Sequence, residues 1–335
     1  MRWCETDLGE LGPEDVLVRV KKSGICGTDY AIYSGHTRFI EMGLIRYPMT
    51  FGHEYSGVVE AVGSAVTRWK TGDRVVSDSA VSCGLCEACR KGNYLLCKKC
   101  RGVGTVNVFD GGYASYTLMP QRHLYALPDS VGYELGALTE PASIGLSAVL
   151  TGRPVIGDTM LVLGTGPIGL GAVLFAHACG ISTVILAGRK SEKLQIGEKL
   201  GADILIDMTR QDLVREVDRI TGGDGVNIAV EATGSLDMLR TATRCSAAGG
   251  RISLVAFYER LATELDLDDL ILRGVEMLPS GGCGGLMGNI IRMFATGRFD
   301  FTPIITHRGQ VERATELLEL LGTDDPLRIK VMLDG

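Results

Sequence analysis

Five cysteines in one short segment have the spacing of a metal-binding lobe. Cys83, Cys86 and Cys89 are spaced C-x-x-C-x-x-C, and Cys97 and Cys100 follow close behind. Four thiolates can surround zinc as a tetrahedron, and they can also hold an iron–sulfur cluster. Zinc is favoured because nothing else in the sequence indicates electron transfer. Four thiolates leave no open position for a substrate, so we expect a structural site, with Cys97 and Cys100 as rival fourth ligands.

A glycine-rich stretch has the spacing of a dinucleotide-binding loop. It follows an apolar, β-prone run at 159–163 and precedes small and apolar residues with helical spacing. The stretch contains Gly164, Gly166, Pro167, Ile168 and Gly169. The first glycine would make the turn, the second would admit a pyrophosphate, and the third would let helix and strand pack. We therefore expect a strand, a tight turn and a helix that bind a dinucleotide.

The residues after the next predicted strand, 183–187, bear on the choice of dinucleotide. In NAD-binding chains an acidic residue about 20 positions beyond the glycine loop binds the ribose. Here Gly188 takes that position, and Arg189 and Lys190 follow it. Two cations without the carboxylate favour a 2′-phosphate, so we expect NADP over NAD; the alternative is that both cations are simply solvated. Thr233, after a later strand, is a further candidate contact for the cofactor.

The composition is that of a globular chain without an export signal. Its 335 residues suffice for about two domains, and a net charge of −6 without a basic stripe argues against a nucleic-acid partner. No apolar run has the length of a membrane helix, and the first residues lack a signal-peptide pattern. We therefore expect a cytoplasmic protein whose ten cysteines stay reduced or bind metal.

The elements that must position these residues change character along the chain. The first part shows short strand patterns, such as 13–22 and 112–117, between glycine turns, as in a small β-barrel. From Asp158 onward, strand patterns alternate with helical ones. The predicted strands are 159–163, 183–187, 204–206, 226–230, 251–255 and 275–278. Strands with intervening helices predict a doubly wound parallel sheet.

Helical patterns fill the intervals between these strands. We expect a helix capped by Ser191 that ends near Gly201, another at 213–220 and a last one at 285–300. The tail at 328–333 has a strand pattern, and we expect it to return to the first domain.

One carboxylate stands among apolar residues in a further helical stretch at 136–150. This residue is Glu140, and Pro141 follows it. A carboxylate in such surroundings needs a cation, a hydrogen bond or a metal. Glu140 is therefore a candidate site residue.

The motifs, taken in order, resemble those of the zinc-dependent medium-chain dehydrogenase/reductase family, in the branch of sorbitol, polyol and threonine dehydrogenases. The resemblance rests on the stretches 24–29 and 52–54, the cysteine lobe, Glu140-Pro141 and 164–169. It implies an α/β protein with a GroES-like β-barrel catalytic domain at 1–150, which includes a structural-zinc lobe near 83–100. A Rossmann cofactor-binding domain at 151–282 and a return to the catalytic domain at 283–335 would complete it.

The resemblance also implies the ligands of two zinc ions. Cys26 and His53 would bind a catalytic zinc, together with a carboxylate from Glu54 or Glu140. In a regular strand His53 and Glu54 would point to opposite faces, so both could bind only if the backbone bends, as Gly52 permits. For the structural zinc, the lobe spacing of the family selects Cys83, Cys86, Cys89 and Cys97.

The resemblance implies an NAD(P)-linked oxidoreductase that acts on a secondary alcohol, a polyol or the corresponding ketone. Zinc would serve as a Lewis acid that lowers the pKa of the alcohol, and hydride would pass to the nicotinamide. Thr28 would take the alcohol proton, and Glu54 and Glu140 are the other candidate catalytic residues. Asp29 would hold the ring of His53. Members of the family are usually homodimers or homotetramers, which we expect here as well.

The chain departs from the family pattern at further positions. Ala31 stands where many relatives have a relay histidine, so the proton must leave through water, the cofactor ribose or nearby His36. The stretch 280–286 lacks the arginine–aromatic pair that grips substrate hydroxyls near sorbitol dehydrogenase, which argues against a sorbitol-type substrate.

Two readings from other classes compete with the enzyme. A zinc-bearing cofactor-binding protein without catalysis, such as a sensor or scaffold, would not need Cys26, His53, Glu140 and Thr28 together. A zinc-finger interaction protein would not account for the alternating strands and helices of the second half. The joint presence of Cys26, His53, Glu140 and Thr28 favours catalysis.

Overall fold

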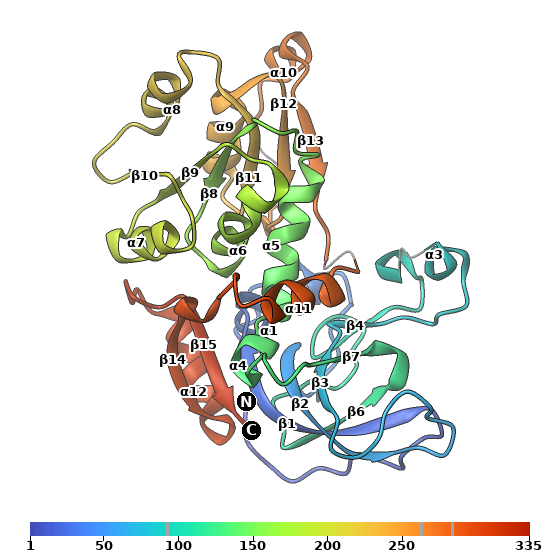
Figure 1. The fold of residues 1–335 in the computed structure, drawn as a ribbon. Helices are drawn as coiled ribbons and strands as arrows, with labels where there is room; N and C mark the ends of the chain where they lie inside the picture. The colour runs from blue at the N-terminus through green and yellow to red at the C-terminus, as the bar shows by residue number, and fades with distance from the viewer. Residues whose placement is uncertain (92–93, 261–263, 283–284) are drawn as a thin grey trace. The chain divides into compact units, whose positions relative to one another are not determined.

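The structure is a computed structural model that describes residues 1–91, 94–260, 264–282 and 285–335. Its contacts divide the chain into two compact units. Unit 1 comprises Met1–Glu140 with Gly285–Gly335, and unit 2 comprises Pro141–Gly284 (Figure 1). Among the described residues, no helix is long and apolar enough to cross a lipid bilayer. Each unit is built on its own sheet.

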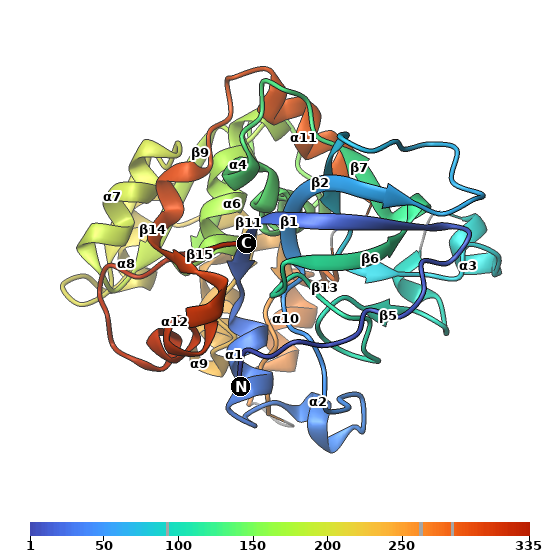
Figure 2. The same cartoon turned by 90° about the horizontal axis from the view of Figure 1, so that it is seen from below.

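The sheet of unit 1 is organised around one long strand, β1. Its order is β14-β15-β1-β2-β3-β7, and β6 also pairs with β1. The partners of β1 are all antiparallel to it. One of them is β15, so a strand from the end of the chain lies directly beside the first strand (Figure 2). The strands concerned are β1 (Asp15–Ile25), β2 (Glu54–Val62), β6 (Tyr116–Pro120) and β15 (Lys330–Asp334).

Shorter elements complete unit 1. Its other strands are β3 (Arg74–Ser77), β4 (Ala80–Val81), β5 (Arg101–Gly102), β7 (Leu124–Ala126) and β14 (Ile305–Gln310). Its helices are α1 (Gly27–Tyr33), α2 (Arg38–Glu41), α3 (Glu87–Arg90), α4 (Tyr133–Ala137), α11 (Met287–Ala295) and α12 (Ala314–Glu319). Valines alternate on the buried face of β1, at Val16, Val18 and Val20, which fixes that face of the strand toward the core.

Unit 2 is a wholly parallel sheet of the order β10-β9-β8-β11-β12-β13. The strands are β8 (Thr159–Leu163), β9 (Thr183–Gly188), β10 (Ile204–Asp207), β11 (Val226–Glu231), β12 (Ser246–Leu254) and β13 (Glu276–Pro279). The helices are α5 (Thr139–Thr151), whose first two residues belong to unit 1, and α6 (Pro167–Ala176), α7 (Ser191–Lys199), α8 (Leu213–Thr221), α9 (Leu236–Cys245) and α10 (Leu267–Arg273). The prediction of a doubly wound parallel sheet is confirmed.

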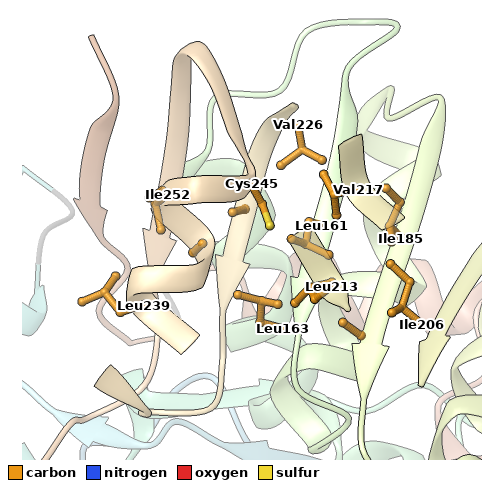
Figure 3. Packing of buried hydrophobic residues seen from close by; sticks show 13 residues of the cluster. Leu161, Leu163, Ile185, Ile206, Leu213, Val217, Val226, Leu239, Cys245 and Ile252 are labelled. Atoms are coloured by element: carbon orange, nitrogen blue, oxygen red, sulfur yellow. The ribbon is translucent and has the colours of Figure 1, made fainter. Parts of the chain in front are cut away.

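A hydrophobic core joins the strands of unit 2 to its helices (Figure 3). Leu161 and Ile185 from the sheet pack with Val217 from α8 and Leu239 from α9, and all four are buried. Burial of each such side chain contributes about 1.5–3 kcal/mol relative to leaving it exposed. This core fixes the ends of β8 and β9, where the glycine-rich loop and Gly188 stand.

Three predicted elements differ in the structure. The stretch 136–150 forms two helices, α4 and α5, because Pro141 lacks an N–H and fits only in the first turn of a helix that begins just before it. Ser191 is the first residue of α7 rather than its cap, which is Lys190 in extended conformation. The strand expected at 112–117 begins only at Tyr116, because the amides of 112 and 113 donate to the backbone of 51–52 instead.

Candidate functional site

Cys26 stands at the junction between β1 and α1. It is the N-cap residue of α1, with extended backbone, and the strand ends directly before it. The carboxylate of Asp29, in the first turn of α1, accepts a hydrogen bond from the Cys26 backbone N–H at 2.9 Å. This turn holds the thiol of Cys26 at a fixed place at the end of the strand.

His53 and Glu54 converge with Cys26 although they are neighbours in the chain. The ligand atoms of the three residues all lie within 4.8 Å of one another. β2 begins only at Glu54, and Gly52 has a φ of +96°, so His53 belongs to a bend rather than to a regular strand. The bend that the sequence required for both side chains to share one site is therefore present, and a left-handed φ at this position favours glycine.

The ring of His53 is oriented by a buried acid. Its Nδ1 lies 3.4 Å from Oδ1 of Asp29, a side chain with no exposed surface. Tyr113 donates to the other carboxylate oxygen at 2.7 Å, so Asp29 is itself held in place. Because Nδ1 faces Asp29, the Nε2 atom is the ring nitrogen available to a metal.

Glu140, at the start of α5, is buried close to this cluster but is not one of the three groups that converge. Burial raises the pKa of Glu140 to about 7, and the negative charge of Glu54 adds to the effect. The two carboxylates therefore repel one another, and one of them needs a positive partner.

Lys330 supplies a positive charge that the sequence analysis missed. Its side chain, at the start of β15, is 2% exposed, and its Nζ lies 2.7 Å from each carboxylate oxygen of Glu54. Burial alone would lower the pKa of Lys330, but the charge of Glu54 raises it, so the side chain is a cation. The only signal in the sequence is one lysine within an apolar tail strand.

The cluster has the composition of a zinc site. A thiol, an imidazole and a carboxylate are the ligand types that zinc takes in proteins. Burial alone would lower the pKa of His53, but Asp29 and Cys26 raise it well above its usual range, so the surroundings stabilise positive charge at this point. The acids Asp29, Glu54 and Glu140 are all buried, and the ammonium of Lys330 pairs with Glu54. A divalent cation therefore fits both the donor set and the charge.

The cysteine lobe brings four thiols together. Cys83, Cys86, Cys89 and Cys97 have sulfur atoms within 4.8 Å of one another. The Cys83–Cys97 and Cys86–Cys89 pairs are 3.5 Å apart, and the Cys83–Cys89 pair is 3.9 Å apart. A tetrahedron with Zn–S bonds of about 2.3 Å requires sulfur separations of roughly 3.8 Å. The lobe thus has the dimensions of a closed four-thiolate site.

Local amides prepare one of these thiols for deprotonation. Backbone N–H groups of Leu85 and Cys86 lower the pKa of Cys83 to about 6, which favours the thiolate that a metal binds. Burial raises the pKa of Cys100 to about 11, but the pKa of Cys86 is raised to about 11 as well, so these values do not separate a ligand from a non-ligand. Cys100 is set apart because it is not part of the converging group. The geometry favours Cys97 over Cys100 as the fourth ligand.

The glycine-rich loop of unit 2 has the backbone expected of a dinucleotide-binding turn. Gly164, directly after β8, has a φ of +111°, which favours glycine. A Cβ on Gly166 would meet no atom within 4 Å, so a ligand can approach that backbone. A Cβ on Gly169 would collide with the carbonyl of Gly164, so the third glycine is needed for packing. Pro167 begins α6, where its missing N–H costs nothing.

The residues that bear on cofactor choice lie at the end of β9. Gly188 is the last residue of that strand, and a Cβ there would come within 2.6 Å of the Thr165 side chain. Arg189 is exposed and Lys190 is partly exposed. Thr233 follows β11, and its backbone N–H donates to the buried carboxylate of Glu231 at 2.8 Å. Its hydroxyl bonds to the same carboxylate, so the side chain of Thr233 has a structural partner.

The remaining sequence-predicted residues are placed as follows. Thr28 is in the first turn of α1, two residues after Cys26. Ala31 is on the same helix, and His36 is an exposed residue of the loop beyond it. Within the stretch 280–286, residues 283–284 lie outside the described residues, and Ser280 is buried.

Two family profiles match the chain. The profile of the alcohol dehydrogenase GroES-like domain matches residues 12–129. The profile of the zinc-binding dehydrogenases matches residues 167–296.

Curated relatives match over nearly the whole length. A sorbitol dehydrogenase of Bacillus subtilis (strain 168) is 31% identical over 310 residues, which are 92% of this chain and 87% of the relative. An L-threonine 3-dehydrogenase of Symbiobacterium thermophilum is 32% identical over 336 residues, which are 98% of this chain and 93% of the relative.

Solved structures with either nicotinamide cofactor resemble the chain. A zinc-binding dehydrogenase of Sinorhizobium meliloti 1021 bound to NADP has a TM-score of 0.90 at 29% identity and covers 98% of this chain and 94% of its own. An alcohol dehydrogenase of Escherichia coli CFT073 complexed with NADH has a TM-score of 0.89 at 27% identity, with coverage of 98% and 94%.

Proposed function

The chain belongs to the zinc-dependent medium-chain dehydrogenase/reductase family, and from this premise we propose that it oxidises a secondary alcohol or polyol, or reduces the corresponding ketone, with NADP at the Cys26 cluster. Its class is that of the NAD(P)-dependent zinc alcohol dehydrogenases. The observation that carries the proposal is the convergence of Cys26, His53 and Glu54 within 4.8 Å, in surroundings that favour a cation.

The side chains of unit 1 at this cluster have two proposed roles, binding the metal and orienting a ligand. Cys26 and His53, with a carboxylate from Glu54 or Glu140, would hold zinc, which supplies Lewis-acid chemistry when bound. Asp29, whose Oδ1 lies 3.4 Å from Nδ1 of His53, would orient the ring so that Nε2 is left for the metal.

Thr28 has the role of proton acceptor in this proposal. Its hydroxyl would take the proton of the alcohol as hydride leaves for the nicotinamide. Its place in the first turn of α1, two residues after Cys26, supports this assignment. Because Ala31 offers no imidazole, the proton would continue to water, to the cofactor ribose or to His36.

The preference for NADP over NAD rests on the end of β9. Gly188 offers no carboxylate to a ribose 2′-hydroxyl, and the exposed Arg189 can meet a 2′-phosphate with two parallel hydrogen bonds. Lys190 adds charge beside it. The pyrophosphate would lie against the backbone of Gly166 at the start of α6, where amides are unpaired.

The cysteine lobe would hold the second zinc in a purely structural role. We assign its ligands as Cys83, Cys86, Cys89 and Cys97, because their sulfur spacing matches a closed tetrahedron. We further propose a cytoplasmic homodimer or homotetramer, which the resemblance to the family supports. Light scattering coupled to size exclusion measures the oligomeric state.

The proposal is tested by nicotinamide absorbance over a panel of alcohols, polyols, threonine and ketones. Each compound is run with NADP and with NAD, before and after treatment with a zinc chelator. Turnover with NADP that the chelator abolishes supports reaction, cofactor and metal together. Protein that holds zinc only in the cysteine lobe and shows no turnover would support the second candidate, a cofactor-binding protein without catalysis.

A further inference from the structure

The cysteine lobe is attached to the rest of unit 1 at a buried acid–imidazole pair. Asp78 directly follows β3, and His123 directly precedes β7. Oδ2 of Asp78 lies 3.4 Å from Nδ1 of His123, and its Oδ1 accepts from Tyr94, inside the lobe, at 3.4 Å. The other ring nitrogen of His123 faces the backbone of Ser82, the residue before Cys83. The pair therefore contacts both the first part and the later part of the lobe.

The neighbours of His123 determine which of its ring nitrogens carries the proton. Nε2 accepts the backbone N–H of Ser82 at 3.1 Å, so this nitrogen is unprotonated. The alternative, donation from Nε2 to the Ser82 carbonyl, has a longer distance of 3.4 Å, and that carbonyl already accepts from Arg122 at 2.6 Å. The ring proton is consequently on Nδ1, where it faces the carboxylate of Asp78.

This arrangement leaves the hydroxyl of Ser82 available to a proposed zinc ligand. The hydroxyl lies 3.5 Å from Nε2, whose lone pair is already used by the backbone N–H. It hydrogen-bonds to Cys89. Burial alone would raise the pKa of the Cys89 thiol, but the hydrogen bond from Ser82 is the strongest influence that lowers it. The hydroxyl thus stabilises the thiolate form that zinc binds.

A serine, a histidine and an aspartate in contact could also form a hydrolytic triad, but these three have a different geometry. In such a triad Nε2 accepts the serine hydroxyl, whereas here it accepts the serine amide. The three residues are only 1–5% exposed, so a substrate could not reach the hydroxyl. Their arrangement fits a role in the lobe itself.

We propose that His123 is a positioning residue of the cysteine lobe: its ring fixes the backbone of Ser82 so that the hydroxyl donates to the thiolate of Cys89. Asp78 keeps the ring in the tautomer that this requires. The inference rests on the proposed function, because it needs the structural zinc ion that we assign to the lobe.

The test measures how fast the lobe loses its zinc. Full-length Cys26→Ser protein lacks the proposed catalytic zinc, so the ion that it gives up to a chromogenic chelator comes from the lobe. In this background the variants are Ser82→Ala, His123→Phe, His123→Gln and the combination of Ser82→Ala with His123→Phe. His307→Phe is the control, since His307 also pairs with an acid, Asp325, but belongs to β14.

Ser82→Ala and His123→Phe should each release zinc about 10-fold faster, because each removes the hydrogen bond to the Cys89 thiolate. The combined variant should be no faster than either single one, since both substitutions break the same interaction. His123→Gln offers an amide oxygen where Nε2 accepts, so it should recover most of the original rate. His307→Phe should keep that rate.

A spectrum separates this role from a general loosening of the lobe. With Co²⁺ in the lobe, the thiolate-to-metal charge-transfer band should move to lower energy in Ser82→Ala and in His123→Phe. The reason is that a thiolate without its hydrogen bond gives up electron density more readily. The band should return in His123→Gln, whereas a variant that is merely loosened would release metal faster without this shift.

An unchanged release rate and band in Ser82→Ala would overturn the inference, and this arm decides the matter if His123→Phe does not fold. Additive effects in the combined variant would overturn it too, since ring and hydroxyl would then act separately. Cys26→Ser protein that binds no zinc would overturn it together with the structural-zinc assignment. The predicted faster release can be observed even if the wild type shows no turnover, so the two failures are distinguishable.

Discussion

At the scale of single residues, the hydroxyl of Thr28 is the group to which the proposed proton transfer is assigned. Thr28→Val keeps the shape of the side chain and removes the hydroxyl, so we expect turnover to fall by about 100-fold or more. Zinc content and NADPH affinity should stay as they are, because Thr28 contacts neither in the proposal. Initial rates, metal analysis and a cofactor titration measure these quantities.

Thr28→Ser is the control for this substitution, since it retains the hydroxyl and should keep most of the turnover. Equal rates for Thr28→Val and the wild type would remove Thr28 from the mechanism.

The exposed guanidinium of Arg189 is expected to select the cofactor. Arg189→Ala should raise the KM for NADPH by about 10- to 100-fold, the effect of losing a hydrogen bond to a charged group worth about 1.5–3 kcal/mol. The KM for NADH should change little, because NADH lacks the 2′-phosphate. The same substitution at the exposed Arg244, at the end of α9, serves as the control. Unchanged NADPH affinity in Arg189→Ala would mean that the cation is only solvated.

Residues that act together over short sequence distances could be predicted, and those joined by tertiary pairing could not. The bend that turns His53 and Glu54 to one site could be anticipated from Gly52, because glycine readily adopts a left-handed backbone, which breaks the alternation of a strand. Lys330 could not, since it meets Glu54 across 276 positions. Its register against Ile25 is set by the pairing of β15 with β1, which no local pattern specifies.

At the scale of elements, the cysteine lobe offers a matched pair of substitutions. Cys97→Ser removes a proposed ligand, so metal analysis should find about one zinc ion per chain instead of two. Cys100→Ser, three residues further on, should keep both ions, because Cys100 is outside the converging group. The loss of a zinc ion in Cys100→Ser, or its retention in Cys97→Ser, would reverse the assignment of the fourth ligand. Iron in place of zinc would revive the iron–sulfur alternative.

Glu134, in α4, connects three strands of unit 1. It accepts from Arg308 of β14 at 2.8 and 3.0 Å and from Lys22 of β1 at 3.4 Å, and Lys22 also pairs with Asp334 of β15. Hydrogen bonds from Arg308 lower the pKa of Glu134 below its usual 4.5. The ionised form therefore stabilises the fold above about pH 4.5, and this contribution is lost as the pH falls through the lowered pKa.

Glu134→Gln should thus lower the free energy of unfolding by about 1 kcal/mol at neutral pH, with a difference from the wild type that shrinks in acid. Urea unfolding at a series of pH values measures this difference. The exposed Glu10→Gln is the control. A difference that stays constant down to about pH 3 would show that the ion pairs contribute nothing.

The existence of helices and strands with strong periodicity could be predicted from the sequence. The residues at which they begin and end depended on single side chains and were harder to predict. The strands of the parallel sheet are apolar runs bounded by glycine and charge, so their existence was clear. The missing N–H of Pro141 is a local signal that the stretch 136–150 divides into α4 and α5. The stretch is apolar throughout, however, and was therefore predicted as one helix. The stretch 112–115 has strand composition, but its amides pair with the backbone of 51–52, a long-range contact.

At the scale of the whole molecule, every proposed metal ligand lies in unit 1, and the glycine-rich loop lies in unit 2. Removal of both zinc ions with a chelator should therefore abolish turnover while NADPH still binds with nearly the same dissociation constant. Fluorescence titration of NADPH before and after chelation measures this. A large loss of NADPH affinity would show that the metals support the cofactor loop, contrary to the expectation that each unit binds its own ligand.

The sheet of unit 1 includes β15, which the ribosome synthesises long after its neighbour β1. Lys330 follows Ile25 by 305 positions, and β15 lies between β1 and β14 in the sheet. At about 5–20 residues per second, roughly 15–60 s of synthesis separate the two residues. All residues of unit 2 are synthesised in this interval. Until Lys330 is made, the edge of β1 lacks its pairing with β15, and the charge of Glu54 lacks its cation. The first proposed ligand to be translated thus belongs to a cluster whose cation, Lys330, is made 305 positions after Ile25.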